Sequence, residues 1–327
     1  MKAISMKKPG SSKELVLKDS GIPIPKQGEL LVKVETAAVN RTDIVTRENQ
    51  NFKEPYPIFG VEIAGTVVEN QSTFTEFPKG TRVCGLVNRG GYAEYAVLPA
   101  DRAILIPEHL DFTQAAGVPE VFLTAYQTLY WLGDLQEGQT VLIHAGASGV
   151  GTAAIQLAKQ LTKATVIVTA GSVDKLAFCE ELGADVVINY KTEDFSERVM
   201  EVTNQEGVDV ILDFIGASYV EKNLKSIKVD GHWVLIGTLG GSVVEEFDLR
   251  SLMAKRITLV GTLLTPRSDA YKAKLTHEMM AKTLPYFESG AIKPIIDCVF
   301  PLEKAAAAHD YMEANKNIGK IILKVTE

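Results

Sequence analysis

The pattern of hydrophobic positions divides the chain into regions with different periods. Between residues 140 and 261, short apolar runs rich in β-branched residues alternate with segments whose apolar residues recur at helical spacing, such as Val173–Leu182 and Ser218–Ile227. This alternation predicts an α/β fold with a doubly wound parallel sheet, because parallel strands need helical crossovers between them. The predicted strands are Val141–Ile143, Val166–Thr169, Val186–Asn189, Val208–Asp213, His232–Ile236 and Thr258–Gly261.

The flanking regions contain shorter alternating runs, separated by turn residues such as Lys79-Gly80 and Gly90-Gly91. They predict a β-rich, barrel-like domain with strands at Leu30–Thr36, Ile63–Val68, Arg82–Leu86 and Tyr92–Leu98. The tail is predicted to return to this domain through helices at Ala270–Ser289 and Leu302–Met312 and strands at Ile295–Phe300 and Lys320–Val325. We therefore expect a β-rich domain at 1–118, a cofactor domain at 119–265, a return at 266–327, and an active site in the cleft between domains.

A glycine-rich turn joins the first strand of the alternating region to its helix. It consists of Gly146, Ala147, Ser148, Gly149, Val150 and Gly151. Small residues let the backbone approach a pyrophosphate, and the N-terminus of the following helix attracts its charge. Ser148 replaces the second glycine of G-x-G-x-x-G, so the motif alone also fits a tight turn without a ligand. Six alternating strands favour the dinucleotide site, at the carboxyl ends of the strands.

Length, charge and cysteine content narrow the class of protein. With 327 residues, of which 46% are hydrophobic, the chain is long enough for two cores. A net charge of −7 without a basic cluster argues against nucleic acid or an anionic membrane as a partner. No apolar run reaches the roughly 18 residues that span a bilayer. Cys84, Cys179 and Cys298 lie far apart, which disfavours a disulfide framework and favours the cytoplasm.

The end of the second predicted strand bears on which nicotinamide cofactor binds. NAD-binding folds place an acidic residue about 20 residues beyond the glycine turn, where it bonds the ribose 2′-hydroxyl. Here the segment runs through Ala170, Gly171 and Ser172, with no carboxylate before Asp174. Ser172 offers a donor and Lys175 a cation to a 2′-phosphate. This favours NADPH, although Lys175 also fits the role of a solvated helix lysine.

The order of these segments resembles the medium-chain dehydrogenase/reductase superfamily and, within it, the zinc-free quinone oxidoreductase family. The resemblance rests on PEVFLTAYQTL at Pro119–Leu129, HAGASGVGTAAIQLAK at His144–Lys159 and ANKNIGKIIL at Ala314–Leu323. NRTDI at Asn40–Ile44, NYKTEDFSE at Asn189–Glu197 and MEANKNIGKI resemble the stress-inducible branch most closely. The resemblance covers nearly the whole chain and implies a GroES-like β-rich catalytic domain together with a six-stranded Rossmann domain.

This resemblance raises the question of zinc, because alcohol dehydrogenases of the superfamily bind a catalytic zinc through cysteine and histidine. At the corresponding ligand positions this chain has Asn40, Val61 and Glu120, and it lacks the four-cysteine lobe between Gly80 and Gly91. The histidines share no ligand spacing and fit packing or surface roles better; they are His109, His144, His232, His277 and His309. We expect no metal, which leaves hydride delivery to an electron-poor acceptor.

The resemblance also implies the remaining site residues. Related quinone oxidoreductases bind the 2′-phosphate through a serine, a lysine and a tyrosine, which correspond to Ser172, Lys175 and Tyr190, although Tyr190 also fits a half-buried anchor. Around the nicotinamide, the resemblance points to Asn40, Asp43, Thr124, Gly237 and Asn317, with Ile215, Gly216 and Leu263 lining the cofactor and Tyr56 facing the acceptor. Asn40 and Asp43 would bond the substrate oxygen or the carboxamide, or instead cap a helix and close a turn.

Three functions remain open from the sequence. The first is NADPH-dependent, zinc-independent reduction of small electron-poor quinones. The second is reduction of the activated C=C bond of enones or enoyl thioesters, which also accept hydride at a polarised conjugated system. The third is a cofactor-binding protein with little turnover, as the lens crystallins of this family are. We also expect a homodimer that pairs through the edge strand at Thr258–Gly261.

Overall fold

The computed structural model describes residues 1–326, and the chain divides into two compact units. The first unit contains Met1–Leu123 together with the residues from Thr265 onward, and the second contains Thr124–Leu264. Among the described residues, no helix is both long and apolar enough to cross a membrane.

A parallel sheet of six strands forms the centre of the second unit, as the sequence predicts. The strands lie in the order β10-β9-β8-β11-β12-β13. The chain adds β9 and β10 on one side of β8 and then β11, β12 and β13 on the other side, so the strand order switches between β8 and β11. A dinucleotide binds at this kind of switch point in doubly wound folds. Their bounds are β8 (Thr140–Ile143), β9 (Thr165–Ala170), β10 (Val186–Asn189), β11 (Val208–Asp213), β12 (Ile227–Leu235) and β13 (Thr258–Gly261).

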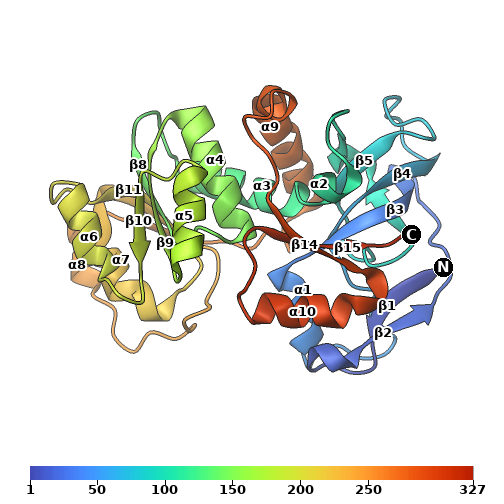
Figure 1. Cartoon of the computed structure of the whole chain (residues 1–327), viewed down its shortest axis with the longest axis horizontal. Helices are drawn as coiled ribbons and strands as arrows, with labels where there is room; N and C mark the ends of the chain where they lie inside the picture. Colours follow the sequence, from blue (N-terminus) through green and yellow to red (C-terminus); the bar gives the residue numbers. More distant parts are fainter. Residues whose placement is uncertain (327) are drawn as a thin grey trace. The chain divides into compact units, whose positions relative to one another are not determined.

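Helices cover both faces of this sheet. Figure 1 shows α4 and α5 on one side and α6 and α7 on the other. The sheet interior is apolar, with Leu142, Ile167 and Ile211 completely buried, because a parallel sheet covered on both faces has no solvent-facing side. The helices are α4 (Gly149–Thr162), α5 (Val173–Glu181), α6 (Phe195–Val202), α7 (Val220–Ser226) and α8 (Leu249–Ala254), and a π-helical segment runs over Gln127–Leu132.

Two predicted boundaries in this unit are wrong. The segment 218–227 forms a short 3-10 turn at Ala217–Tyr219 followed by α7, and Ile227 already belongs to β12. The register of β12 against β11 is irregular, since Ile227 pairs with Val208 but His232 pairs with Val210. Polar residues at the irregularity interrupt the apolar run, which is why the sequence predicts a strand that begins only at His232.

The first unit is built on a seven-stranded, mostly antiparallel sheet. Its strands lie in the order β14-β15-β3-β4-β5-β7, and β6 pairs with β3. Their bounds are β3 (Glu29–Val39), β4 (Glu62–Asn70), β5 (Arg82–Leu86), β6 (Tyr95–Pro99), β7 (Ala103–Leu105), β14 (Ile296–Pro301) and β15 (Lys320–Lys324). A separate two-stranded sheet pairs β1 (Lys2–Met6) with β2 (Leu15–Asp19).

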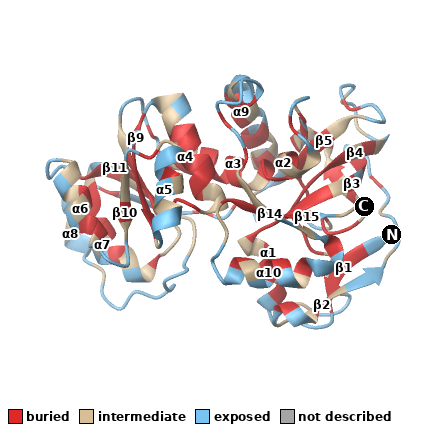
Figure 2. Cartoon of the chain, viewed as in Figure 1, coloured by how far each residue is buried: buried red, intermediate tan, exposed pale blue. Residues whose placement is uncertain are grey.

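The remaining α-helices are α1 (Arg41–Glu48), α2 (Phe112–Ala116), α3 (Pro119–Tyr126), α9 (Asp269–Glu288) and α10 (Ala305–Glu313). Short 3-10 turns lie at Ser12–Glu14, at Ala100–Arg102 and, just before α10, at Leu302–Lys304. Buried residues line the interior strands, as Figure 2 shows for β3 and β4. The predicted strand at 92–98 begins later, at Tyr95. Tyr92 instead accepts a hydrogen bond from Ile4 through its carbonyl, so this segment pairs with β1 before it pairs with β3.

Candidate functional site

The glycine-rich turn lies between β8 and α4, at the carboxyl edge of the parallel sheet. A Cβ at Gly146 would lie 2.8 Å from Val168 Cβ, and a Cβ at Gly151 would lie 2.5 Å from the Ala145 carbonyl oxygen. Both distances are too short for a real Cβ, so close packing requires glycine at both positions. Ser148 caps α4, since its hydroxyl oxygen accepts a hydrogen bond from the Gly151 amide at 3.1 Å.

The amino end of α4 offers free donors to an anion. Gly149 and Val150 occupy the first two positions of the helix, so their amides have no acceptor within it, and neither donates to another described residue. The first turn contains no acidic side chain, and the helix is 14 residues long. Its dipole and its open amides therefore suit a phosphate group.

The other predicted cofactor residues of the second unit follow different strands of the same sheet. Ser172 and Lys175 follow β9, Tyr190 follows β10, Ile215 and Gly216 follow β11, Gly237 follows β12, and Leu263 follows β13. Because all six strands are parallel, their carboxyl ends meet at one edge. The structure thus brings these residues to the same edge as the glycine turn.

Asp213 fixes the loop after β11, and sequence reasoning did not single it out. One carboxylate oxygen accepts the amides of Ile215 at 2.7 Å and Gly216 at 3.0 Å. The other accepts Asn223 Nδ2 at 3.1 Å and Trp233 Nε1 at 3.0 Å. Gly216 has a φ of 78°, in the left-handed region that favours glycine. An acidic residue at the end of an apolar strand was the available signal for this role.

Ser172, Lys175 and Tyr190 gather around the start of α5. Ser172 is the N-cap residue, is exposed, and makes no capping hydrogen bond with its side chain. A Cβ at Gly171 would lie 2.5 Å from the Tyr190 hydroxyl oxygen, so the tyrosine packs against the backbone just before Ser172. The exposed Asp174 is the acidic residue in the first turn of α5, and its charge would oppose a phosphate there.

In the first unit, Asp43 organises the start of α1. Its carboxylate accepts the Asn40 amide at 2.9 Å, the Tyr92 hydroxyl at 2.9 Å and the Gly60 amide at 3.2 Å. The side chain is buried, and burial raises the pKa of Asp43 to about 6 against the opposing effect of these donors. Protein donors thus enclose this carboxylate, which fits the helix-capping alternative better than contact with a substrate.

Asn40 also joins a buried cluster with Glu62 and Lys320. One Glu62 carboxylate oxygen accepts Asn40 Nδ2 and Lys320 Nζ, each at 2.7 Å. Lys320 Nζ donates as well to Asn40 Oδ1 at 2.6 Å and to the Val39 carbonyl at 3.1 Å. Sequence reasoning gave neither charged residue a role. Each of them begins a strand, β4 or β15, and is followed directly by apolar residues, and that position was the signal.

Glu120 lies in the first turn of α3 beside this cluster. Its amide donates to the second carboxylate oxygen of Glu62 at 2.7 Å. Glu120 as a whole residue is half-buried, and its carboxyl accepts no hydrogen bond from the described residues. Burial raises the pKa of Glu120 to about 8, with further increases from Glu62 and Asp43, whereas Lys320 and Lys272 act in the opposite direction.

The residues at the relatives' zinc-ligand positions do not fit zinc. Val61 is a buried aliphatic side chain without a donor atom, and Asn40 is already hydrogen-bonded to Lys320 and Glu62. Zinc prefers nitrogen and sulfur ligands, and within residues 1–326 no three His, Cys, Asp or Glu side chains are placed to hold a metal ion. The positive charge beside Asn40 and Glu62 is the ammonium group of Lys320.

Local contacts hold the other predicted residues. Asn317 Nδ2 donates to the Gly319 carbonyl at 2.7 Å, in the loop before β15. Tyr56 is half-buried against the core of the first unit. Thr124 is buried on α3, and its carbonyl accepts the Thr128 hydroxyl at 2.7 Å. Asn40, Asp43, Tyr56 and Asn317 belong to the first unit, whereas Thr124 belongs to the second.

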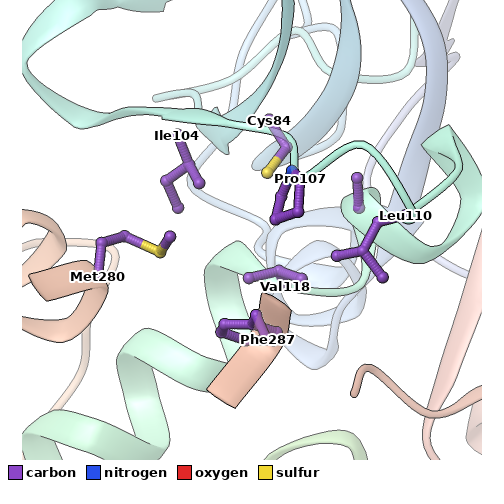
Figure 3. A pocket seen from close by; sticks show the side chains of 8 residues that line it. Cys84, Ile104, Pro107, Leu110, Val118, Met280 and Phe287 are labelled. Carbon is purple, nitrogen blue, oxygen red and sulfur yellow. The ribbon is translucent and has the colours of Figure 1, made fainter. Parts of the chain in front are cut away.

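A cavity of about 10 Å³ lies elsewhere in the first unit (Figure 3). Its lining is apolar and includes Ile104, Leu110, Met280 and Phe287. Cys84 also lines it, and burial together with the Glu62 charge raises the pKa of this thiol. The cavity is about the size of one water molecule and offers no set of polar partners, so it is a small packing void rather than a ligand site.

Comparisons with known proteins identify the family. Residues 149–279 match the family model of zinc-binding dehydrogenases, and residues 26–108 match the alcohol dehydrogenase GroES-like domain. Quinone oxidoreductase of Sus scrofa is 31% identical over 328 residues, which cover 99% of this chain and 97% of that protein.

Solved structures give the same result. The quinone oxidoreductase of Escherichia coli complexed with NADPH has a TM-score of 0.90 and 27% identity, covering 99% of this chain and 100% of that one. An NAD-dependent alcohol dehydrogenase has a TM-score of 0.89 and 29% identity, covering 100% of both chains. The GroES-like and Rossmann folds expected from the sequence are thus confirmed. The chain belongs to the medium-chain dehydrogenase/reductase superfamily, as an oxidoreductase related to the quinone oxidoreductases.

Proposed function

We propose that the protein is an NADPH-dependent, zinc-independent quinone oxidoreductase that reduces small electron-poor quinones. One observation carries the proposal: a Lys320–Glu62–Asn40 cluster stands where dehydrogenases of the superfamily place a zinc site. The chain nevertheless keeps the glycine turn and the open amino end of α4. It therefore retains features for binding a dinucleotide but lacks the ligands of a metal that would activate an alcohol.

The chemistry of the acceptor follows from this combination. An alcohol must lose a proton as it loses hydride, and a zinc ion assists by lowering the pKa of the bound oxygen. A quinone already has a low-lying acceptor orbital, so holding it against the nicotinamide supplies most of what the reaction needs. Hydride delivery to a quinone is the reaction that suits these residues best.

The preference for NADPH rests on the start of α5. Ser172 presents a hydroxyl without a capping bond, and Tyr190 packs beside it against Gly171. Lys175 adds a positive charge to this helix end, and Ala170 replaces the acidic residue that favours NAD. We propose that these side chains bind the 2′-phosphate, and that the carboxylate of Asp174 turns toward solvent in the complex.

We also propose a homodimer that pairs through β13. This strand lies at the edge of the sheet, where its outer backbone groups have no partner among the described strands. Apolar side chains are exposed on this strand and on the helix that precedes it in the chain, including Leu259 on β13 and Leu249 and Met253 on α8. Sedimentation equilibrium should give about twice the chain mass of 35.6 kDa at micromolar concentration. A mass near that of one chain would contradict the dimer.

An acceptor panel tests the proposed function. The expected result is rapid oxidation of NADPH by a small naphthoquinone, much slower oxidation of NADH, and no reduction of NADP by simple primary alcohols. Fast turnover of an enone with slow turnover of quinones would assign the protein to C=C reduction instead. Cofactor binding without turnover of any acceptor would favour the non-enzymatic alternative.

A further inference from the structure

In the buried cluster of the first unit, the carboxyl group of Glu120 differs from those of Glu62 and Asp43 because it accepts no hydrogen bond from a described residue. Glu62 accepts hydrogen bonds from Asn40, Lys320 and the Glu120 amide, which use both of its oxygens. Asp43 accepts three hydrogen bonds and is likewise enclosed. The Glu120 carboxyl accepts none from the described residues, and Glu120 is a half-buried residue rather than a fully enclosed one.

The charge of the cluster favours a proton on Glu120. Three carboxyl groups lie here, from Glu62 on β4, Asp43 on α1 and Glu120 on α3. Lys320 on β15 is bonded to Glu62, and Lys272 on α9 contributes a weaker opposing charge. Burial and the two neighbouring carboxylates therefore keep the pKa of Glu120 near 8, so that the group is largely protonated at neutral pH.

We propose that Glu120 is the proton donor for the anionic oxygen that hydride transfer leaves on the quinone. This inference rests on the proposed function and on the expectation, implied by the family resemblance, that Asn40 lies beside the nicotinamide. The side-chain amide of Asn40 and the backbone amide of Glu120 donate to opposite oxygens of the same buried Glu62 carboxylate, so the two residues are neighbours.

The step is balanced as follows. The C–H bond at the reacting carbon of the nicotinamide breaks, and its electron pair and hydrogen pass to the quinone, which becomes a hydroquinone monoanion while NADPH becomes NADP. The O–H bond of Glu120 then breaks, and its proton forms the second O–H bond of the hydroquinone. The Glu120 carboxylate then regains a proton from water, which a residue that is only partly buried can reach. The net change is quinone, NADPH and one proton to hydroquinone and NADP.

Other acids of the cluster are less suited to this role. The Tyr92 hydroxyl is completely buried and donates to Asp43 at 2.9 Å. His309 is buried between Tyr92 and Arg47, and burial and the Arg47 charge lower its pKa to about 3, so it carries no acidic proton of the right strength. Glu120 alone in this group combines partial exposure with a carboxyl free of protein donors.

The variant Glu120→Gln tests the proposal, because glutamine keeps the size of the side chain and removes its transferable proton. We expect kcat for quinone reduction to fall by about a hundredfold or more, while the Kd for NADPH stays unchanged. The loss should be smaller for quinones whose hydroquinones are strong acids, because these products need the donor least. Glu76→Gln is the matched control. It makes the same change at an exposed glutamate outside the cluster and should retain full activity.

The pH profile provides a second readout. Wild-type kcat should fall as the pH rises through about 8, since only protonated Glu120 can donate, and this limb should disappear in Glu120→Gln. Glu120→Asp keeps an acid at shorter reach and should retain the limb with reduced kcat, which keeps the test valid if the glutamine variant folds poorly.

Each outcome decides the question. The assignment would be overturned if kcat of Glu120→Gln stayed within about twofold of wild type and still fell above about pH 8. The quinone reductase function would then still stand. Loss of the limb in Tyr56→Phe but not in Glu120→Gln would also overturn it and assign the proton to the tyrosine. A wild-type protein that reduces no quinone would remove both proposals together.

Discussion

Lys320 Nζ lies 2.7 Å from a carboxylate oxygen of Glu62, and only 3% of Lys320 and none of Glu62 is exposed. The two residues are far apart in the sequence, and strand register brings them together. Ile321 of β15 pairs with Val39 on one side of β3, and Ile63 of β4 pairs with Ala37 on the other. The charged pair therefore brackets the end of β3, where Asn40 begins the turn into α1.

Breaking this pair is expected to destabilise the protein strongly. Lys320→Met removes the ammonium group and leaves the Glu62 carboxylate buried without its charged partner. Such losses cost about 3–5 kcal/mol of the free energy of unfolding. Urea unfolding followed by circular dichroism measures the change.

A control and a rescue variant make the Lys320 test specific. Lys324→Met changes an exposed lysine of the same strand and should alter stability by less than about 0.5 kcal/mol. The double variant Lys320→Met with Glu62→Gln should recover part of the loss, because the unpaired charge is gone. Equal effects of the two lysine variants would contradict the importance of the buried pair.

Lys175 is expected to discriminate NADPH from NADH. Lys175→Ala removes a charge-assisted contact to the 2′-phosphate worth about 1.5–3 kcal/mol, which corresponds to a roughly ten- to hundredfold weaker Kd for NADPH. Binding of NADH should hardly change. Fluorescence titration measures both constants, and Lys163→Ala, at an exposed lysine after α4, is the control. Equal losses for the two cofactors would remove Lys175 from the phosphate site.

Activity is expected to survive exhaustive chelation. Asn40, Val61 and Glu120 stand at the relatives' ligand positions, and a lysine ammonium already bonds the oxygens of this cluster. Dialysis against a strong chelator followed by elemental analysis and a turnover assay measures the outcome. One zinc ion per chain, lost together with activity, would refute the zinc-independent mechanism.

Glu120 is expected to make stability depend on pH. Its pKa is about 8 in the folded protein, against an ordinary value of 4.5 in the unfolded chain. Between these values the folded state binds more protons, so this group's contribution to the free energy of unfolding decreases as the pH rises. Glu120→Gln should therefore match wild type near pH 4.5 and be more stable than wild type above pH 8. A difference that stays constant over this range in urea titrations would contradict the raised pKa.

Much of the parallel sheet could be predicted from the sequence, because strands buried on both faces are continuous apolar runs. Val186–Asn189, Val208–Asp213 and Thr258–Gly261 have the predicted bounds. The prediction failed where a strand contains polar residues, as at the start of β12. Short elements such as β7 and α1 were also missed, since tertiary contacts rather than a long periodic pattern stabilise them.

The candidate site was predictable to a different degree in each unit. The cofactor residues follow successive parallel strands, so the topology alone sends them to one edge of the sheet. The Lys320–Glu62–Asn40 cluster depends on the register of three strands, which no local pattern encodes. In the sequence, Glu120 stands out only because it replaces a zinc ligand of the relatives. That its carboxyl accepts no hydrogen bond, unlike those of Glu62 and Asp43, can be recognised only from the structure.

The most direct test of the account is a single-turnover reaction of the protein with a small naphthoquinone and NADPH deuterated at the transferred position, under anaerobic conditions. The account predicts one hydroquinone formed per NADPH oxidised, at a rate that is slower with deuterium than with hydrogen, because the hydride leaves the nicotinamide in the reaction. An absence of NADPH oxidation, or oxidation at the same rate with both isotopes and release of semiquinone, would contradict it.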